Sequence, residues 1–151
     1  MVKYGRQFEA GLAGLSSTSG WAHVDYAYYK QSLKAMLSST LPPLPITADF
    51  AGEGPEAEAV RSLDATFRRS LLSDIAGCDA CFGEQCAKLR ERMEAAHFLR
   101  EAYEKGFAAH EDADAAIRAC REQLLELHRW SALNYLAVLN VVQKHDKSRM
   151  L

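Results

Sequence analysis

The sequence predicts an all-α protein in which an N-terminal helical hairpin packs on two long antiparallel helices. Three observations predict this fold class. Apolar residues recur every three to four positions along most of the chain, which is the period of a helix buried on one face. No stretch shows the alternation of apolar and polar residues that is typical of a half-buried strand. All 4 prolines fall between residues 38 and 55, so proline does not interrupt the helical pattern elsewhere.

The first two predicted helices are short and close together. Residues 1–15 carry apolar side chains about one turn apart, at Tyr4, Phe8, Leu12 and Leu15. The Gly- and Ser-rich stretch SSTSG then ends this pattern. A second helix follows over residues 21–37, with inward side chains expected at Val24, Tyr29, Leu33, Met36 and Leu37. The short connection between the two helices predicts a hairpin.

The middle of the chain contains a loop and then a long helix. Residues 38–55 are Pro/Gly-rich, and we expect a loop there because proline cannot donate the helical hydrogen bond. Residues 56–103 carry one apolar stripe, which predicts a helix of about 65 Å. Its members are Val60, Leu63, Phe67, Leu71, Ile75, Cys78, Phe82, Cys86, Leu89 and Met93, with Phe67, Ile75 and Phe82 predicted as core residues. Gly77 and Gly83 lie inside this run and predict a kink or a close helix contact.

The last helix is predicted to return alongside the long one. Gly106 and the acidic stretch 110–114 indicate a turn followed by a helix N-terminus. The helix then spans residues 112–147, with Ile117, Cys120, Leu124, Leu127, Ser131 and Val138 facing its neighbour. Two long antiparallel helices joined by a tight turn form the spine of a helical bundle.

Length and composition exclude several classes of function. A chain of 151 residues with 48% apolar and 25% charged residues fits a single globular domain, 1–151. A formal net charge of −2 gives no overall positive field for nucleic acid. No run approaches the roughly 18 apolar residues of a membrane span, and the first residues lack the apolar segment of a secretory signal. We therefore expect a cytoplasmic protein that does not insert into a membrane.

The cysteines offer a weak metal or redox signal. Cys78 and Cys81 form a CxxC pair, which a helix would place one turn apart. The sequence has no second CxxC and no histidine at a usual ligand spacing beside this pair. Cys78 and Cys86 also fall on the apolar stripe, where cysteine packs as a small hydrophobe. We expect buried reduced thiols and no resident metal, although a role for Cys78 and Cys81 is left open.

Three segments, taken in order, resemble an SPX domain. The opening MVKYGRQF is similar to the family's MKFGKxL start and places Lys3 on its early lysine. The segment WAHVDYAYYKQSL is similar to W–YIxYxxLKxxL and aligns Tyr26 and Lys30 with the family's tyrosine and lysine. The segment LNYLAVLNVVQKHDK is similar to LNYxGFxKILKKxDK, with matches at Leu133, Asn134, Tyr135, Lys144, Asp146 and Lys147. The similarity spans essentially the whole chain.

The resemblance implies a phosphate-sensing regulatory domain. SPX domains bind inositol polyphosphates and pyrophosphates and report phosphate status to a partner protein or a fused effector domain. The ligand-binding residues it implies are Lys3, Tyr26, Lys30, Lys144 and Lys147, with Lys34 and Arg6 as further candidates. Lysine ammonium groups suit this role as point charges for phosphate, and a tyrosine hydroxyl adds a donor. Fusion to a transporter or a polyphosphate polymerase would place the domain at the cytosolic face of a membrane.

Two positions depart from the family pattern. Asn140 and Gln143 stand where the last helix of the family carries lysine, which leaves Lys147 alone in that cluster. A hydrogen bond to a charged group contributes roughly 1.5–3 kcal/mol, so the loss of two lysines predicts about a hundredfold weaker binding. The alternative is therefore an SPX-like helical protein-interaction scaffold with weakened ligand binding. An enzyme is the third reading, and no catalytic motif supports it.

Overall fold

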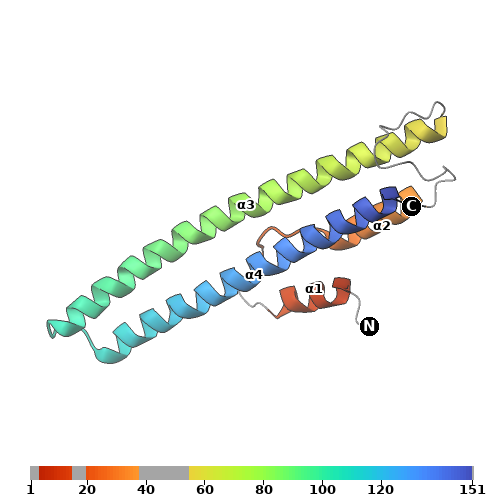
Figure 1. Ribbon diagram of the computed structural model, residues 1–151. Helices are drawn as coiled ribbons and strands as arrows, with labels where there is room; N and C mark the ends of the chain where they lie inside the picture. Colours follow the sequence, from red (N-terminus) through yellow and green to blue (C-terminus); the bar gives the residue numbers. More distant parts are fainter. Residues whose placement is uncertain (1–3, 15–19, 38–54, 151) are drawn as a thin grey trace.

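The computed structural model describes residues 4–14, 20–37 and 55–150 of the chain. This part contains no strand and consists of the helices α1 (Tyr4–Ala13), α2 (Tyr26–Leu37), α3 (Pro55–Glu104) and α4 (His110–Met150). Helices α3 and α4 run antiparallel, and α1 and α2 lie along the half of this pair that is remote from its turn (Figure 1). Helix α2 contacts both α3 and α4, whereas α1 packs on α4. The predicted all-α bundle is confirmed.

Helix α2 begins at Tyr26, five residues later than predicted. Its N-cap is Asp25, whose carboxylate accepts a hydrogen bond from the backbone N–H of Tyr28 at 3.1 Å. An Asp side chain in this position satisfies one of the free N–H groups at a helix start, and the cap residue itself is not helical. The cap therefore sets the start of α2.

The segment before α2 is bonded to α4 instead of forming helix. The indole Nε1 of Trp130 donates to the carbonyl oxygen of Ala22 at 2.9 Å. The backbone N–H of Val24 donates to Oδ1 of Asn134 at 2.8 Å. These two bonds hold residues 21–25 in an irregular conformation, because they use backbone groups that a helix would pair internally.

Helix α3 is continuous over 50 residues. It starts at Pro55, which suits the first position of a helix because its missing N–H would have no partner there. The predicted loop 38–55 lies outside the described residues except for this proline. The predicted close helix contact is wrong for Gly83, since a Cβ added there would meet nothing within 4 Å. A Cβ added on Gly77 would lie 4.0 Å from Ala22 Cβ, which is an ordinary contact distance.

A glycine turn joins α3 to α4. Gly106 adopts a φ of 81°, a conformation that side-chain-bearing residues rarely take. Its N–H donates to the carbonyl of Tyr103 at 2.9 Å, and the N–H of Phe107 donates to the carbonyl of Ala102 at 2.7 Å. This pair of bonds is a Schellman motif, which caps α3 and sends the chain back as α4.

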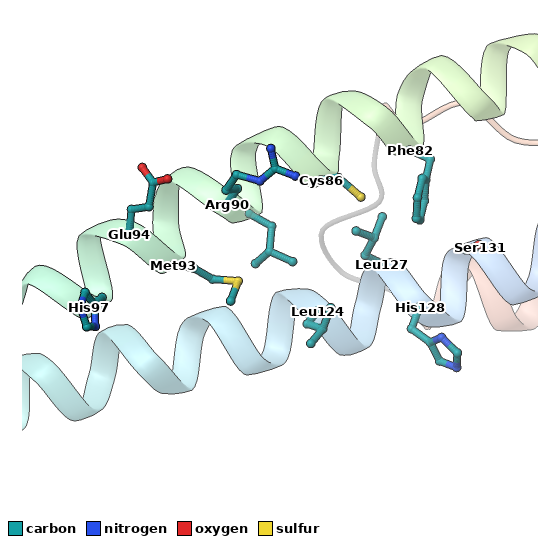
Figure 2. A pocket seen from close by; sticks show the side chains of 11 residues that line it. Phe82, Cys86, Arg90, Met93, Glu94, His97, Leu124, Leu127, His128 and Ser131 are labelled. Atoms are coloured by element: carbon teal, nitrogen blue, oxygen red, sulfur yellow. The ribbon is translucent and has the colours of Figure 1, made fainter. Parts of the chain in front are cut away.

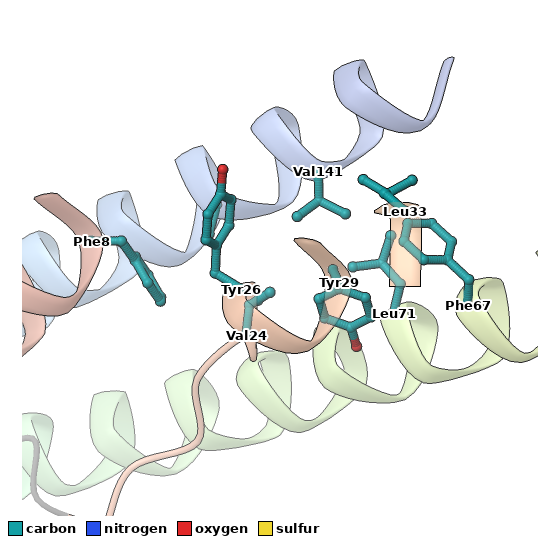
Figure 3. Close-up of a cluster of buried hydrophobic side chains, with 9 residues drawn as sticks. Phe8, Val24, Tyr26, Tyr29, Leu33, Phe67, Leu71 and Val141 are labelled. Carbon is teal, nitrogen blue, oxygen red and sulfur yellow. The ribbon is translucent and has the colours of Figure 1, made fainter. Parts of the chain in front are cut away.

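The core lies where all four helices meet. Its main cluster, drawn in Figure 3, consists of Phe8, Val24, Tyr26, Tyr29, Leu33, Phe67, Leu71, Ala137 and Val141. A smaller cluster nearer the turn contains Leu89, Leu127 and Trp130. Helix α1 joins this core through a close approach to α4, because a Cβ on Gly11 would lie only 2.9 Å from Leu133 Cδ2.

Only one of the three predicted core residues of α3 is buried. Phe67 is 2% exposed, whereas Ile75 is 37% and Phe82 is 40% exposed, so those two predictions are wrong. The partly buried positions beside them are Asp74 and Cys81, so the inward-facing stripe of α3 follows the 3.5-residue repeat of long packed helices. Other residues predicted to face inward but exposed are Leu37, Leu63, Met93 and Leu124.

Candidate functional site

The centre of the candidate site is a contact between α2 and α4. The Tyr26 ring is buried beside Phe8, and their ring centroids are 6.2 Å apart. The Tyr26 hydroxyl points towards α4 (Figure 3), where it donates to Asn140 Oδ1 at 2.8 Å. The same hydroxyl accepts a hydrogen bond from Lys144 Nζ at 2.6 Å. The buried ring thus fixes the position of an ammonium group at the surface.

Helical spacing explains why both partners reach one hydroxyl. Asn140 and Lys144 are four residues apart on α4 and therefore lie on the same face. The Lys144 ammonium also lies 5.2 Å from the Tyr26 ring centroid, a distance at which a cation is attracted to the ring face. An ammonium has three N–H donors, so two besides the bond to Tyr26 can serve an anion.

The other predicted ligand residues that the structure describes lie on α1, α2 and α4. Lys30 follows Tyr26 by one turn of α2 and is partly exposed. Lys147 follows Lys144 by about one turn of α4 and is exposed. Lys34 is exposed in the last turn of α2, and Arg6 is exposed on α1. Lys3 lies outside the described residues. Joint binding of one ligand by these side chains stays a prediction.

Asn140 has a role that the resemblance to SPX domains does not suggest. In that resemblance Asn140 is only a position without the family's lysine. In the structure its side chain accepts a hydrogen bond from the Tyr26 hydroxyl. Gln143 is exposed, so a lysine at that position would add a surface charge. Asn140 and Gln143 are therefore not equivalent positions, because Asn140 orients the Tyr26 hydroxyl that is hydrogen-bonded to Lys144.

A buried His–Asp pair joins α4 to α3 next to Lys144, and the sequence does not predict it. His145 Nε2 is 2.6 Å from Asp64 Oδ1, and the two residues are 7% and 8% exposed. Arg68 Nε contacts the other oxygen of Asp64 at 3.0 Å, and the Phe67 ring stacks on the imidazole at 4.9 Å. This pair ties the last turns of α4 to α3. Its sequence signal is the position of His145 one turn after the buried Val141.

Asn134 forms a second buried polar centre. Its Oδ1 accepts the N–H of Val24, and its Nδ2 donates to the carbonyl of Trp130 at 2.9 Å. The Cys78 thiol also donates to Oδ1, at 3.7 Å. Asn134 belongs to the LNY segment near the start of the last motif, and these contacts give it a structural role in joining three parts of the chain.

Tyr29 and Asp74 join α2 to α3. The Tyr29 hydroxyl donates to Asp74 Oδ2 at 2.7 Å, and the N–H of Asp25 donates to the same oxygen at 3.2 Å. Burial, the hydrogen bond to Asp74 and the charge of that carboxylate all raise the pKa of Tyr29 well above its usual range. The hydroxyl therefore keeps its proton.

The cysteines are all free thiols and partly exposed. Burial raises the pKa of Cys78 to about 11, with smaller contributions from Asp74 and Cys81. A thiol with such a pKa is protonated at neutral pH, which makes it a poor nucleophile and metal ligand. Within the described ranges, no group of three or more His, Cys, Asp or Glu side chains is placed to hold a metal ion.

Comparison of the chain with known protein families, curated proteins and solved structures finds no match. Among the helices described, none is long and apolar enough to cross a membrane.

Proposed function

We propose that this chain is an SPX-like regulatory domain that binds inositol polyphosphates or pyrophosphates and signals phosphate status to an attached or partner protein. The observation that carries the proposal is the 2.6 Å bond between Lys144 Nζ and the Tyr26 hydroxyl. It joins two of the three segments in which the resemblance to SPX domains places ligand-binding residues. A binding surface for phosphate groups needs cations held at fixed positions, and this bond holds one.

The chemistry of the surrounding side chains supports the same ligand class. Lys30 and Lys147 are each about one turn from the Tyr26–Lys144 contact, on α2 and α4. Several ammonium groups from separate helices suit a ligand that carries several phosphates, because each phosphate accepts charge-assisted hydrogen bonds. The chain has a net charge of −2, so attraction of an anion depends on this local group of lysines.

Asn140 and Gln143 should make binding weaker than in a site with lysine at both positions. Asn140 still contributes, since it accepts a hydrogen bond from the Tyr26 hydroxyl. The phenol oxygen is then oriented to accept a hydrogen bond from Lys144. Replacement of Gln143 by lysine adds a surface charge without disturbing that bond. Replacement of Asn140 by lysine also removes the acceptor for Tyr26 and should therefore gain less.

The proposal is tested by calorimetric titration with inositol hexakisphosphate at fixed salt. Lys30→Ala and Lys144→Ala should each weaken binding by about 10- to 100-fold, the equivalent of one lost charge-assisted hydrogen bond. Lys88→Ala is the matched control, because Lys88 pairs with Glu84 on α3 at 3.3 Å. Gln143→Lys should tighten binding. Equal affinities for wild type, Lys30→Ala and Lys144→Ala would contradict the proposal.

A protein-interaction scaffold is the second candidate function. Large apolar side chains exposed on the part of the α3–α4 pair beyond α1 and α2 favour it, with Phe98 at 71% and Phe107 at 84% exposed. Exposed apolar surface of this kind often marks contact with another chain. Wild-type protein that fails to bind inositol hexakisphosphate at low salt, while Gln143→Lys also fails, would favour the scaffold.

A further inference from the structure

A groove runs between α3 and α4 on the turn-side half of the molecule. We call it the distal groove; it has a volume of about 730 Å³. Figure 2 shows the residues that line it, which are Phe82, Cys86, Leu89, Arg90, Met93, Glu94, His97, Leu124, Leu127, His128 and Ser131. Leu89 and Leu127 are buried, whereas Met93 and Leu124 are 54% and 53% exposed. The groove is thus an apolar surface that the chain itself leaves partly open.

The distal groove lies where the bundle is only two helices thick. Helices α1 and α2 cover the other half of the α3–α4 pair (Figure 1). In the covered half, α3 and α4 pack around residues of α2 such as Tyr29 and Leu33. Four-helix bundles bury the apolar faces of their helices in a common core, and two helices alone leave one side of their contact in water. A further pair of helices packed on the distal groove would complete such a bundle.

The charges at the groove edge indicate which chain supplies the additional helices. Arg90 and Glu94 are one turn apart on the α3 side of the groove (Figure 2). Neighbouring charges of α3 form ion pairs within the helix, at Glu84–Lys88 and Arg100–Glu104. Within the described part of the chain, Arg90 and Glu94 take part in no ion pair. Two opposite charges one turn apart are self-complementary across a two-fold axis, because residue i then meets residue j on the partner and j meets i.

We propose that a second copy of this chain occupies the distal groove and completes an antiparallel four-helix bundle. The two-fold axis passes between Arg90 and Glu94, so that each arginine faces the glutamate of the other copy. Arg92 donates a hydrogen bond to Gln123, which places the neighbouring residue Leu124 at the same level of the hairpin as this axis. Leu124 therefore packs near the Leu124 of the second copy. Helix α3 lies on the α3 of the second copy, and α4 lies on its α4.

The available area is close to what a stable dimer needs. The α3 segment from Phe82 to Glu104 is about 35 Å long, and two adjacent helices are about 20 Å wide. The resulting face of about 700 Å² approaches the roughly 800 Å² per partner that specific protein interfaces bury. Pairing of Arg90 with Glu94 contributes orientation more than affinity, since charged groups at an interface edge mainly select the correct partner.

The test is sedimentation of the full chain over a range of concentrations, without inositol phosphate, so that its outcome is independent of ligand binding. Wild type should change from monomer to dimer as concentration rises. Arg90→Glu and Glu94→Arg should each weaken the dimer by at least about tenfold, because each creates two like-charge contacts. Leu124→Glu should abolish the dimer. Circular dichroism identifies any variant that fails to fold.

The two charge variants provide a sharper control when they are mixed. One copy then has glutamate at both positions and the other has arginine at both, so an equal mixture should form a heterodimer. The double variant Arg90→Glu/Glu94→Arg should dimerise like wild type. Leu72→Glu, at an exposed site of α3 outside the groove, should not change the dimer. A wild-type monomer at several hundred micromolar would overturn the proposal, as would single charge variants that dimerise like wild type.

Discussion

Asn134 joins α4 to the segment before α2 and to Trp130 in its own helix. Asn134→Ala leaves the N–H of Val24 without its acceptor in a buried place. An unsatisfied buried donor costs about 1–3 kcal/mol, and we expect the free energy of unfolding to fall by that amount. Urea unfolding followed by circular dichroism measures the change. Gln143→Ala, at an exposed site of the same helix, should change stability by less than about 0.5 kcal/mol. Equal midpoints for the two variants would contradict the role of Asn134.

At the scale of the helical elements, two glycines should respond to alanine with opposite signs. Gly83 lies inside α3 with open space around it, so Gly83→Ala should stabilise the protein by about 0.8–1.0 kcal/mol through helix propensity. Gly106 ends α3 with a φ of 81°, and Gly106→Ala should destabilise it by about 1–2 kcal/mol because a Cβ disfavours that conformation. Thermal unfolding distinguishes the two. The same sign for both substitutions would mean that the turn does not cap α3 as described.

The last turns of α4 depend on their contact with α3. Asp64→Ala removes the partner of both His145 and Arg68. We expect faster amide hydrogen exchange in residues 141–147, which carry Lys144 and Lys147, because local opening then needs less free energy. Asp79→Ala, at an exposed site of α3, is the control and should leave exchange there unchanged. Unchanged protection in Asp64→Ala would show that other contacts hold this end of α4.

The stability of the whole molecule should fall in alkaline solution. Cys78 has a pKa of about 11 in the folded protein against an ordinary value of 9.0, and the pKa of Tyr29 is raised in the same direction. Between these values the unfolded chain loses protons that the folded chain keeps, so the free energy of unfolding decreases as pH rises. Their contribution is complete below about pH 9 and is lost progressively as the pH rises towards about 11. Denaturant unfolding from pH 8 to pH 11 should show a smaller decrease in the Cys78→Ala/Tyr29→Phe double variant. Equal slopes would contradict this assignment.

The sequence predicts the fold class well because amphipathic helices of this length repeat a simple pattern. It predicts residue burial less well, since the inward-facing stripe of α3 includes the partly buried Asp74 and Cys81 and leaves Ile75 and Phe82 exposed. The start of α2 was also missed. Asp25 is a recognisable cap, but the bonds that stop the preceding residues from forming helix come from α4, 108 and 110 positions away.

The contact at the centre of the candidate site follows from the sequence, but its ligand binding stays a prediction. The resemblance to SPX domains predicts that Tyr26 and Lys144 lie close together, and the structure contains a hydrogen bond between them. The same comparison described Asn140 only as a lost charge, because a list of matching positions contains no information about tertiary hydrogen bonds. His145 and Asp64 were missed for a related reason. Each sits on the inward face of its helix, but only the packed structure shows that the two side chains meet.

The turn at Gly106 has a consequence for the order in which the chain folds. Contacts between α3 and α4 span more of the sequence with distance from this turn: 31 positions for Arg92–Gln123 and 81 for Asp64–His145. Contacts that close short loops form first, because closing a longer loop costs more chain entropy. We therefore expect the two long helices to zip together from the turn towards the opposite end. Helix α2 docks last, since its contacts need α3 and α4 already side by side. The Tyr26–Lys144 contact would then be among the final interactions to form and among the first to open.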